Sequence, residues 1–117
     1  MRVFDTTTFF EEKLMMDLRF NILNPYVDKF VVCEARFSHS GKEKNINFNK
    51  KDYPKFEDKI IHLVLDNDPV EKNTNLQKNP YWLRQSSIDR IEAQRNYISK
   101  ALDVADQNDY IIYSDND

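Results

Sequence analysis

Four short apolar runs, most of them leading directly into a carboxylate, constrain the fold of this 117-residue chain more than any other feature. The runs lie at residues 3–4, 28–34, 59–65 and 110–113. The run at 28–34 has a continuous apolar middle, which is typical of a strand buried on both faces of a parallel sheet. Helix-type stretches separate the first run from the second and the third from the fourth. This order predicts an α/β fold with a mostly parallel sheet of about four strands.

Both helix-type stretches begin at a capping-box pattern. Thr8 and Glu11 have that spacing at the first, which should end at Asn24-Pro25 because proline disfavours a helical residue before it. Ser86 and Asp89 have it at the second, predicted to run to about residue 105. Apolar stripes expected to face the core are formed by Phe10, Leu14, Leu18 and Ile22, and by Ile88, Ile91, Ile98, Leu102 and Ala105.

The connections are more polar. Residues 49–58 are expected to form a short helix broken by Pro54, and residues 67–83 a loop. In that loop Tyr81 and Trp82 would pack the segment onto the domain or, alternatively, offer a stacking surface to a base or sugar. The only glycine lies in a predicted turn at residues 38–42.

Composition limits the class of protein. Residues 1–117 fit a single soluble α/β domain, and a net charge of −3 offers no attraction to nucleic acid. No stretch approaches the roughly 20 apolar residues of a membrane span, and no signal peptide is recognisable. The single cysteine, Cys33, is expected to be buried and fits a reducing compartment. His39 and His62 are too isolated to predict a metal cluster.

Carboxylates at strand ends indicate where a ligand would bind. Ligands of open α/β sheets bind beyond the carboxyl ends of the strands, where Asp5, Glu34, Asp66 and Asp115 fall.

Two Asp-x-Asp triplets stand at such ends, at residues 66–68 and 115–117. Two carboxylates with this spacing can hold a hard divalent cation, which can bridge the oxygens of a diphosphate. Equally, aspartates are common in turns for their local hydrogen bonding.

Arg95 is expected on the inward side of the second helix, within about 40° of its apolar stripe. A buried arginine needs an anionic partner. That partner would be Glu34 or Asp66 in a salt bridge, or a nucleotide or diphosphate in a binding site.

Five segments together resemble glycosyltransferase family 17, the β-1,4-mannosyl-glycoprotein β-1,4-N-acetylglucosaminyltransferase family. They are "FDTTTFFEEKLMMDLRFNIL", "VDKFVVCEARFSHSGKEK", "FEDKIIHLVLDNDP", "EAQRNYISKAL" and "DYIIYSDND". The resemblance covers nearly the whole chain, and the five segments in register are more specific than any one of them.

The resemblance implies a Rossmann-like GT-A fold that binds a UDP-sugar, expected to be UDP-N-acetylglucosamine, with Mn²⁺ or Mg²⁺. It implies that Asp115 and Asp117 hold the metal and that Arg95 meets the nucleotide or orders the acidic loop. Glu34 is expected near the nucleoside, and Asp66 is a further nucleoside contact or a turn residue. Asp5 is assigned to the same nucleotide-sugar site.

Family members usually continue the Ser-Asp-x-Asp motif with glutamate and an Ile-Pro stretch, followed by an acceptor-binding half with the general base. The chain is therefore expected to be the N-terminal, donor-binding part of a transferase acting on a glycan acceptor, with little activity alone. The alternative is a non-catalytic α/β domain that binds a partner and whose triplets are turns. A cytoplasmic location is expected, or the Golgi lumen for an animal-type member.

Overall fold

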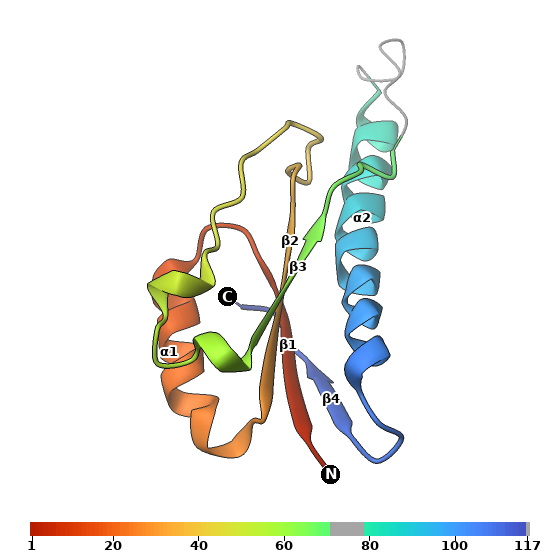
Figure 1. Cartoon of the computed structure of the whole chain (residues 1–117). Helices are drawn as coiled ribbons and strands as arrows, with labels where there is room; N and C mark the ends of the chain where they lie inside the picture. The colour runs from red at the N-terminus through yellow and green to blue at the C-terminus, as the bar shows by residue number, and fades with distance from the viewer. Residues whose placement is uncertain (71–78, 117) are drawn as a thin grey trace.

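The computed structural model describes residues 1–70 and 79–116, and shows an α/β fold. Its sheet has four parallel strands in the order β3-β2-β1-β4. The strands are β1 (Val3–Phe9), β2 (Lys29–Ala35), β3 (Ile60–Leu65) and β4 (Tyr110–Tyr113). Helix α1 (Lys13–Leu23) covers one face of the sheet and α2 (Pro80–Tyr97) the other (Figure 1). The prediction of an α/β fold with a mostly parallel sheet is confirmed.

Short 3-10 helices fill several connections. They are Asn24–Tyr26, Lys50–Asp52, Glu57–Lys59 and Ile98–Val104. The second and third flank Pro54, so the polar segment forms two short turns in place of one broken helix. The first follows α1 directly, which places the end of that helix at the predicted Asn24-Pro25.

Strand β1 is longer than predicted because the threonines after Phe4 extend it. Thr6 is fully buried, and its hydroxyl donates to the Ile112 carbonyl at 2.8 Å. β-branched side chains favour this extended conformation. Thr8 therefore lies in the strand, and its prediction as a helix cap was wrong. Helix α1 begins after Glu12, whose carboxylate accepts the Phe10 and Glu11 amides at 3.0 and 3.2 Å.

The apolar stripe predicted for α1 does not face the sheet. Leu14 and Ile22 are 73% and 65% exposed, whereas Met16 and Phe20 are buried. Phe20 packs against Phe30 of β2, with ring centroids 4.7 Å apart. The helix docks on the face that contacts these rings, and the predicted stripe points away from the core.

Helix α2 also differs from its prediction. It begins at Pro80, where the Asn79 side chain accepts the Tyr81 and Trp82 amides. Tyr81 and Trp82 thus lie in its first turn, in place of the predicted loop. The buried residues of α2 are polar, namely Ser86, Arg90 and Gln94, while Ile88 is 44% exposed.

Two apolar clusters lie on opposite faces of the sheet. Phe30 and Val32 belong to the cluster under α1, and Val31 and Cys33 to the cluster that contains Ile98. Successive strand residues point to opposite faces, so β2 is buried on both. The predicted burial of Cys33 and of the middle of segment 28–34 is confirmed. Within the described residues, no helix has the length and apolar character needed to cross a membrane.

Candidate functional site

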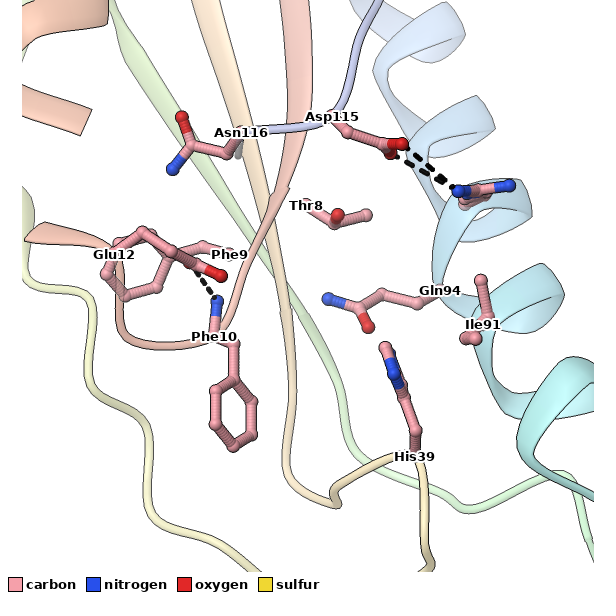
Figure 2. Close-up of a pocket in the computed structure, with 10 residues that line it drawn as sticks. Thr8, Phe9, Phe10, Glu12, His39, Ile91, Gln94, Asp115 and Asn116 are labelled. Atoms are coloured by element: carbon pink, nitrogen blue, oxygen red, sulfur yellow. Dashed lines mark hydrogen bonds and ion pairs between the residues drawn. The ribbon is translucent and has the colours of Figure 1, made fainter. Parts of the chain in front are cut away.

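A polar pocket of about 170 Å³ opens at the carboxyl end of the sheet. Figure 2 shows its lining, which comes from four parts of the chain. These are the end of β1 and the following turn (Thr8, Phe9, Phe10, Glu12), the turn after β2 (His39), helix α2 (Ile91, Gln94, Arg95) and the segment after β4 (Asp115, Asn116). The sheet brings them together because its parallel strands end at one edge.

Asp115 places a carboxylate at one end of this pocket. Its Oδ1 accepts the Tyr113 hydroxyl at 2.6 Å, and both oxygens lie 3.3 Å from Arg95 Nη2. The Tyr113 hydrogen bond lowers the pKa of Asp115 most, desolvation opposes it, and the charge and hydrogen bond of Arg95 lower the pKa further, so that it lies below its usual range. Its side chain is 51% exposed, so the carboxylate is accessible to a ligand.

Arg95 faces this pocket and not the core. Its side chain is 49% exposed, and its guanidinium lies 5.8 Å from the centroid of the Tyr113 ring. The prediction that Arg95 lies on the inward side of α2 was wrong, and of its two expected roles the salt bridge to Glu34 or Asp66 is not formed, because Arg95 pairs with Asp115. The buried face of α2 carries Arg90 and Gln94, which turns Arg95 towards the segment after β4.

Arg19 of α1 links two of the predicted site residues, and sequence reasoning missed it. Its Nε and Nη2 donate to the two oxygens of Asp5, both at 2.7 Å. It also donates to the Ser114 hydroxyl at 2.5 Å and to the Asp115 carbonyl at 3.2 Å. Asp5 is 4% exposed, so it acts through Arg19 on the segment that carries Asp115. The available signal was the single arginine in the apolar helix.

Glu34 and Asp66 lie outside the residues that line the pocket. Glu34 is fully buried and accepts Lys44 Nζ, the Asn47 amide and the Phe48 amide at 2.6 to 2.8 Å. Asp66 is exposed and pairs with Arg36 at 2.5 Å. Their roles as nucleoside contacts stay predictions.

The first triplet is held by ion pairs and turn hydrogen bonds. Both Asp68 oxygens lie 3.0 Å from Arg90 Nε, and Oδ1 also accepts the Val70 amide at 2.9 Å. With Asp66 paired to Arg36, both carboxylates of this triplet already have protein partners. This arrangement is consistent with turn residues.

Only one carboxylate of the second triplet lies among the residues that the structure describes. Asp115 supplies an ionised carboxylate, while Asp117 lies outside the described residues. No group of three potential ligands (His, Cys, Asp or Glu) occurs among the residues that the structure describes. Mg²⁺ is typically bound by one or two carboxylates together with substrate phosphates and water. A cation bound at Asp115 would therefore need ligands beyond the described side chains, such as substrate phosphates and water.

The parallel sheet and the polar pocket at its carboxyl edge define an α/β protein with a pocket at the position where open sheets bind their ligands. The model of glycosyltransferase family 17 matches residues 1–117, and the chain belongs to that family. Membership implies a glycosyltransferase with sugar substrates. No significant match was found among curated proteins or among solved structures.

Proposed function

We propose that this chain is the donor-binding part of a GT-A-type, metal-dependent glycosyltransferase. The donor is a UDP-sugar, UDP-N-acetylglucosamine in the proposal, and the acceptor is a glycan. The observation that carries this proposal is the Asp115 carboxylate paired with Arg95 in the pocket at the carboxyl end of the sheet. An arginine next to a carboxylate presents both groups that a metal-bound diphosphate needs.

Each group has a separate part. Asp115 and Asp117 would hold Mn²⁺ or Mg²⁺, and Arg95 would donate hydrogen bonds to the diphosphate. When bound, the cation neutralises charge that develops on the departing nucleoside diphosphate. Arg19 keeps Asp115 at the pocket by holding its backbone carbonyl and the neighbouring Ser114.

Calorimetric titration of UDP with and without Mn²⁺ tests the proposal. We expect binding that requires the metal, and a loss of affinity of at least about tenfold in Asp115→Asn, which removes a ligand charge but keeps the side-chain size. Asp103→Asn is the matched control, because Asp103 is an exposed aspartate that does not line the pocket. Equal affinity with and without Mn²⁺, or an unaffected Asp115→Asn variant, would contradict the proposal.

The donor sugar is tested separately, by competition. UDP-N-acetylglucosamine should displace a bound fluorescent UDP analogue at lower concentration than UDP-galactose or UDP-glucose. Equal competition by all three would retain the nucleotide site but reject N-acetylglucosamine as the preferred sugar.

A further inference from the structure

The only glycine of the chain lies against a buried arginine. Gly41 has φ +88°, a conformation that residues with a Cβ rarely adopt. A Cβ at this position would lie 2.5 Å from Arg90 Nη2 and 2.7 Å from its Cζ. The Gly41 amide donates to the Ser38 carbonyl at 2.9 Å, which closes the turn over the guanidinium. Glycine is therefore required by both the backbone conformation and the close approach.

Arg90 connects three parts of the fold. It lies on α2 and is 5% exposed, and its Nε meets both Asp68 oxygens in the segment after β3. Its Nη1 donates to the His39 carbonyl at 3.2 Å, in the turn after β2. Loss of any one partner would leave a buried charge incompletely paired, which is costly. The three contacts together determine where the His39 backbone lies.

His39 is the residue that this arrangement presents to the pocket. Figure 2 shows its imidazole rising from the turn towards Gln94, while Asp115 lies on the other side of Gln94. The Phe10 ring, 42% exposed, is also away from the Asp115 end. Two aromatic side chains thus line the part of the pocket remote from the carboxylate. Planar bases stack on histidine and phenylalanine rings.

We propose that His39 contacts the nucleoside end of the bound donor, and that Arg90 is the positioning residue that holds His39 there. This inference rests on the proposed function, because it takes the diphosphate to lie at Asp115 and Arg95. A ligand anchored at that end extends past Gln94 and brings its base to His39 and Phe10. The turn containing Gly41 and the carboxylate of Asp68 thereby serve the ligand site without contacting the ligand.

The two histidines make a direct test possible, because His62 is an internal reference. His62 lies in β3 beside Glu34 and does not line the pocket. In ring-selective NMR spectra recorded with Mg²⁺, UDP and uridine should shift the His39 signals and leave those of His62 in place. Pyrophosphate with Mg²⁺ should shift the Arg95 side-chain signal without moving His39.

The possible results separate the two proposals. UDP binding that moves Arg95 but not His39 would overturn the His39 assignment alone. A His39 shift caused equally by pyrophosphate would overturn its assignment to the nucleoside end. Failure of UDP to bind at all would overturn the proposed function together with this inference.

Variants test the positioning role. His39→Ala changes an exposed side chain and should weaken UDP binding about 3- to 10-fold, the effect of one lost contact, with pyrophosphate binding unchanged. Arg90→Lys should weaken UDP binding to a similar extent and should add little to the loss in His39→Ala. Lys42→Ala, in the same turn but outside the pocket lining, should bind UDP normally. Additive losses in the double variant would contradict the positioning role.

Discussion

Glu34 and Asp66 both stand at the carboxyl end of a strand, but only Glu34 is enclosed by the protein. Burial raises the pKa of Glu34, but the neighbouring His62 ring and hydrogen bonds from the Asn47 amide, Lys44 and the Phe48 amide outweigh this effect, so the pKa is lowered and the carboxyl stays ionised at neutral pH. The Lys44 side chain that pairs with it is 11% exposed. Both acids stand at the end of an apolar run in the sequence, but only Glu34 is buried and belongs to the core.

Neutralising Glu34 should therefore destabilise the protein. Glu34→Gln leaves Lys44 without its counter-ion and turns an amide donor towards backbone N–H groups, at a cost of about 3 kcal/mol. Asp66→Asn, in a pair whose side chains are 53% and 64% exposed, should cost less than about 1 kcal/mol. Urea unfolding measures both. Equal losses would show that burial of the Glu34 pair does not matter.

At the scale of elements, Arg19 joins α1 to the central strand β1 and to the segment after the edge strand β4. It binds Asp5 of β1 through two hydrogen bonds and reaches Ser114 and Asp115 after β4. Strand β4 is short, lies at the edge of the sheet and pairs only with β1 among the described strands. The position of Asp115 therefore depends on a helix nearly 100 residues earlier.

Arg19→Lys should loosen β4 because lysine cannot form the two-pronged pair with Asp5. We expect a loss of about 1–2 kcal/mol in the free energy of unfolding, and faster amide hydrogen exchange in residues 110–116 than elsewhere in the sheet. Arg36→Lys is the control, because Arg36 also pairs with an aspartate, Asp66, but both side chains of that pair are exposed. Unchanged exchange of the β4 amides would refute this role of Arg19.

For the molecule as a whole, ionisable groups limit stability at both ends of the pH range. The pKa values of Glu34 and Asp109 are lowered in the folded protein from ordinary values of 4.5 and 3.8. Their contribution is fully present above those values and is lost as the pH falls below them. Burial, and then the charge of Glu34, raises the pKa of Cys33 from 9.0 to about 12. Cys33 therefore ionises at a lower pH in the unfolded chain than in the folded protein, and the free energy of unfolding falls above pH 9.

Urea unfolding across the pH range should therefore show a plateau between about pH 5 and 9. The buried Glu34 carboxyl and Cys33 thiol each contribute a slope of up to about 1.4 kcal/mol per pH unit in the interval in which they titrate. Cys33→Ala should flatten the decline between pH 9 and 10 while leaving the acid side unchanged. If the free energy of unfolding of Cys33→Ala declined above pH 9 as steeply as that of the unchanged protein, other groups would be responsible for the decline.

Local pattern was enough to predict the class of fold. Apolar runs of strand length alternate with helical stretches, and the burial of segment 28–34 on both faces follows from its own residues. The family resemblance singled out Asp115, rather than the first triplet, as the candidate site residue. Helix faces were harder to predict, because periodicity gives a repeat but not the side that docks. In α1 the buried residues are Met16 and Phe20, whose phase is offset from Leu14 and Leu18.

The sequence by itself determined the order of elements, the parallel sheet and the carboxylates at its edge, since these depend on residues close together in the chain. Only the tertiary structure decided which arginine is buried. Arg90 and Arg95 are five positions apart and differ by about 140° around α2. Arg90 is the buried one because two segments distant in sequence accommodate it. Asp68 supplies its counter-charge, and the turn at Gly41 leaves space for its guanidinium. Arg95 is consequently left facing Asp115 at the pocket.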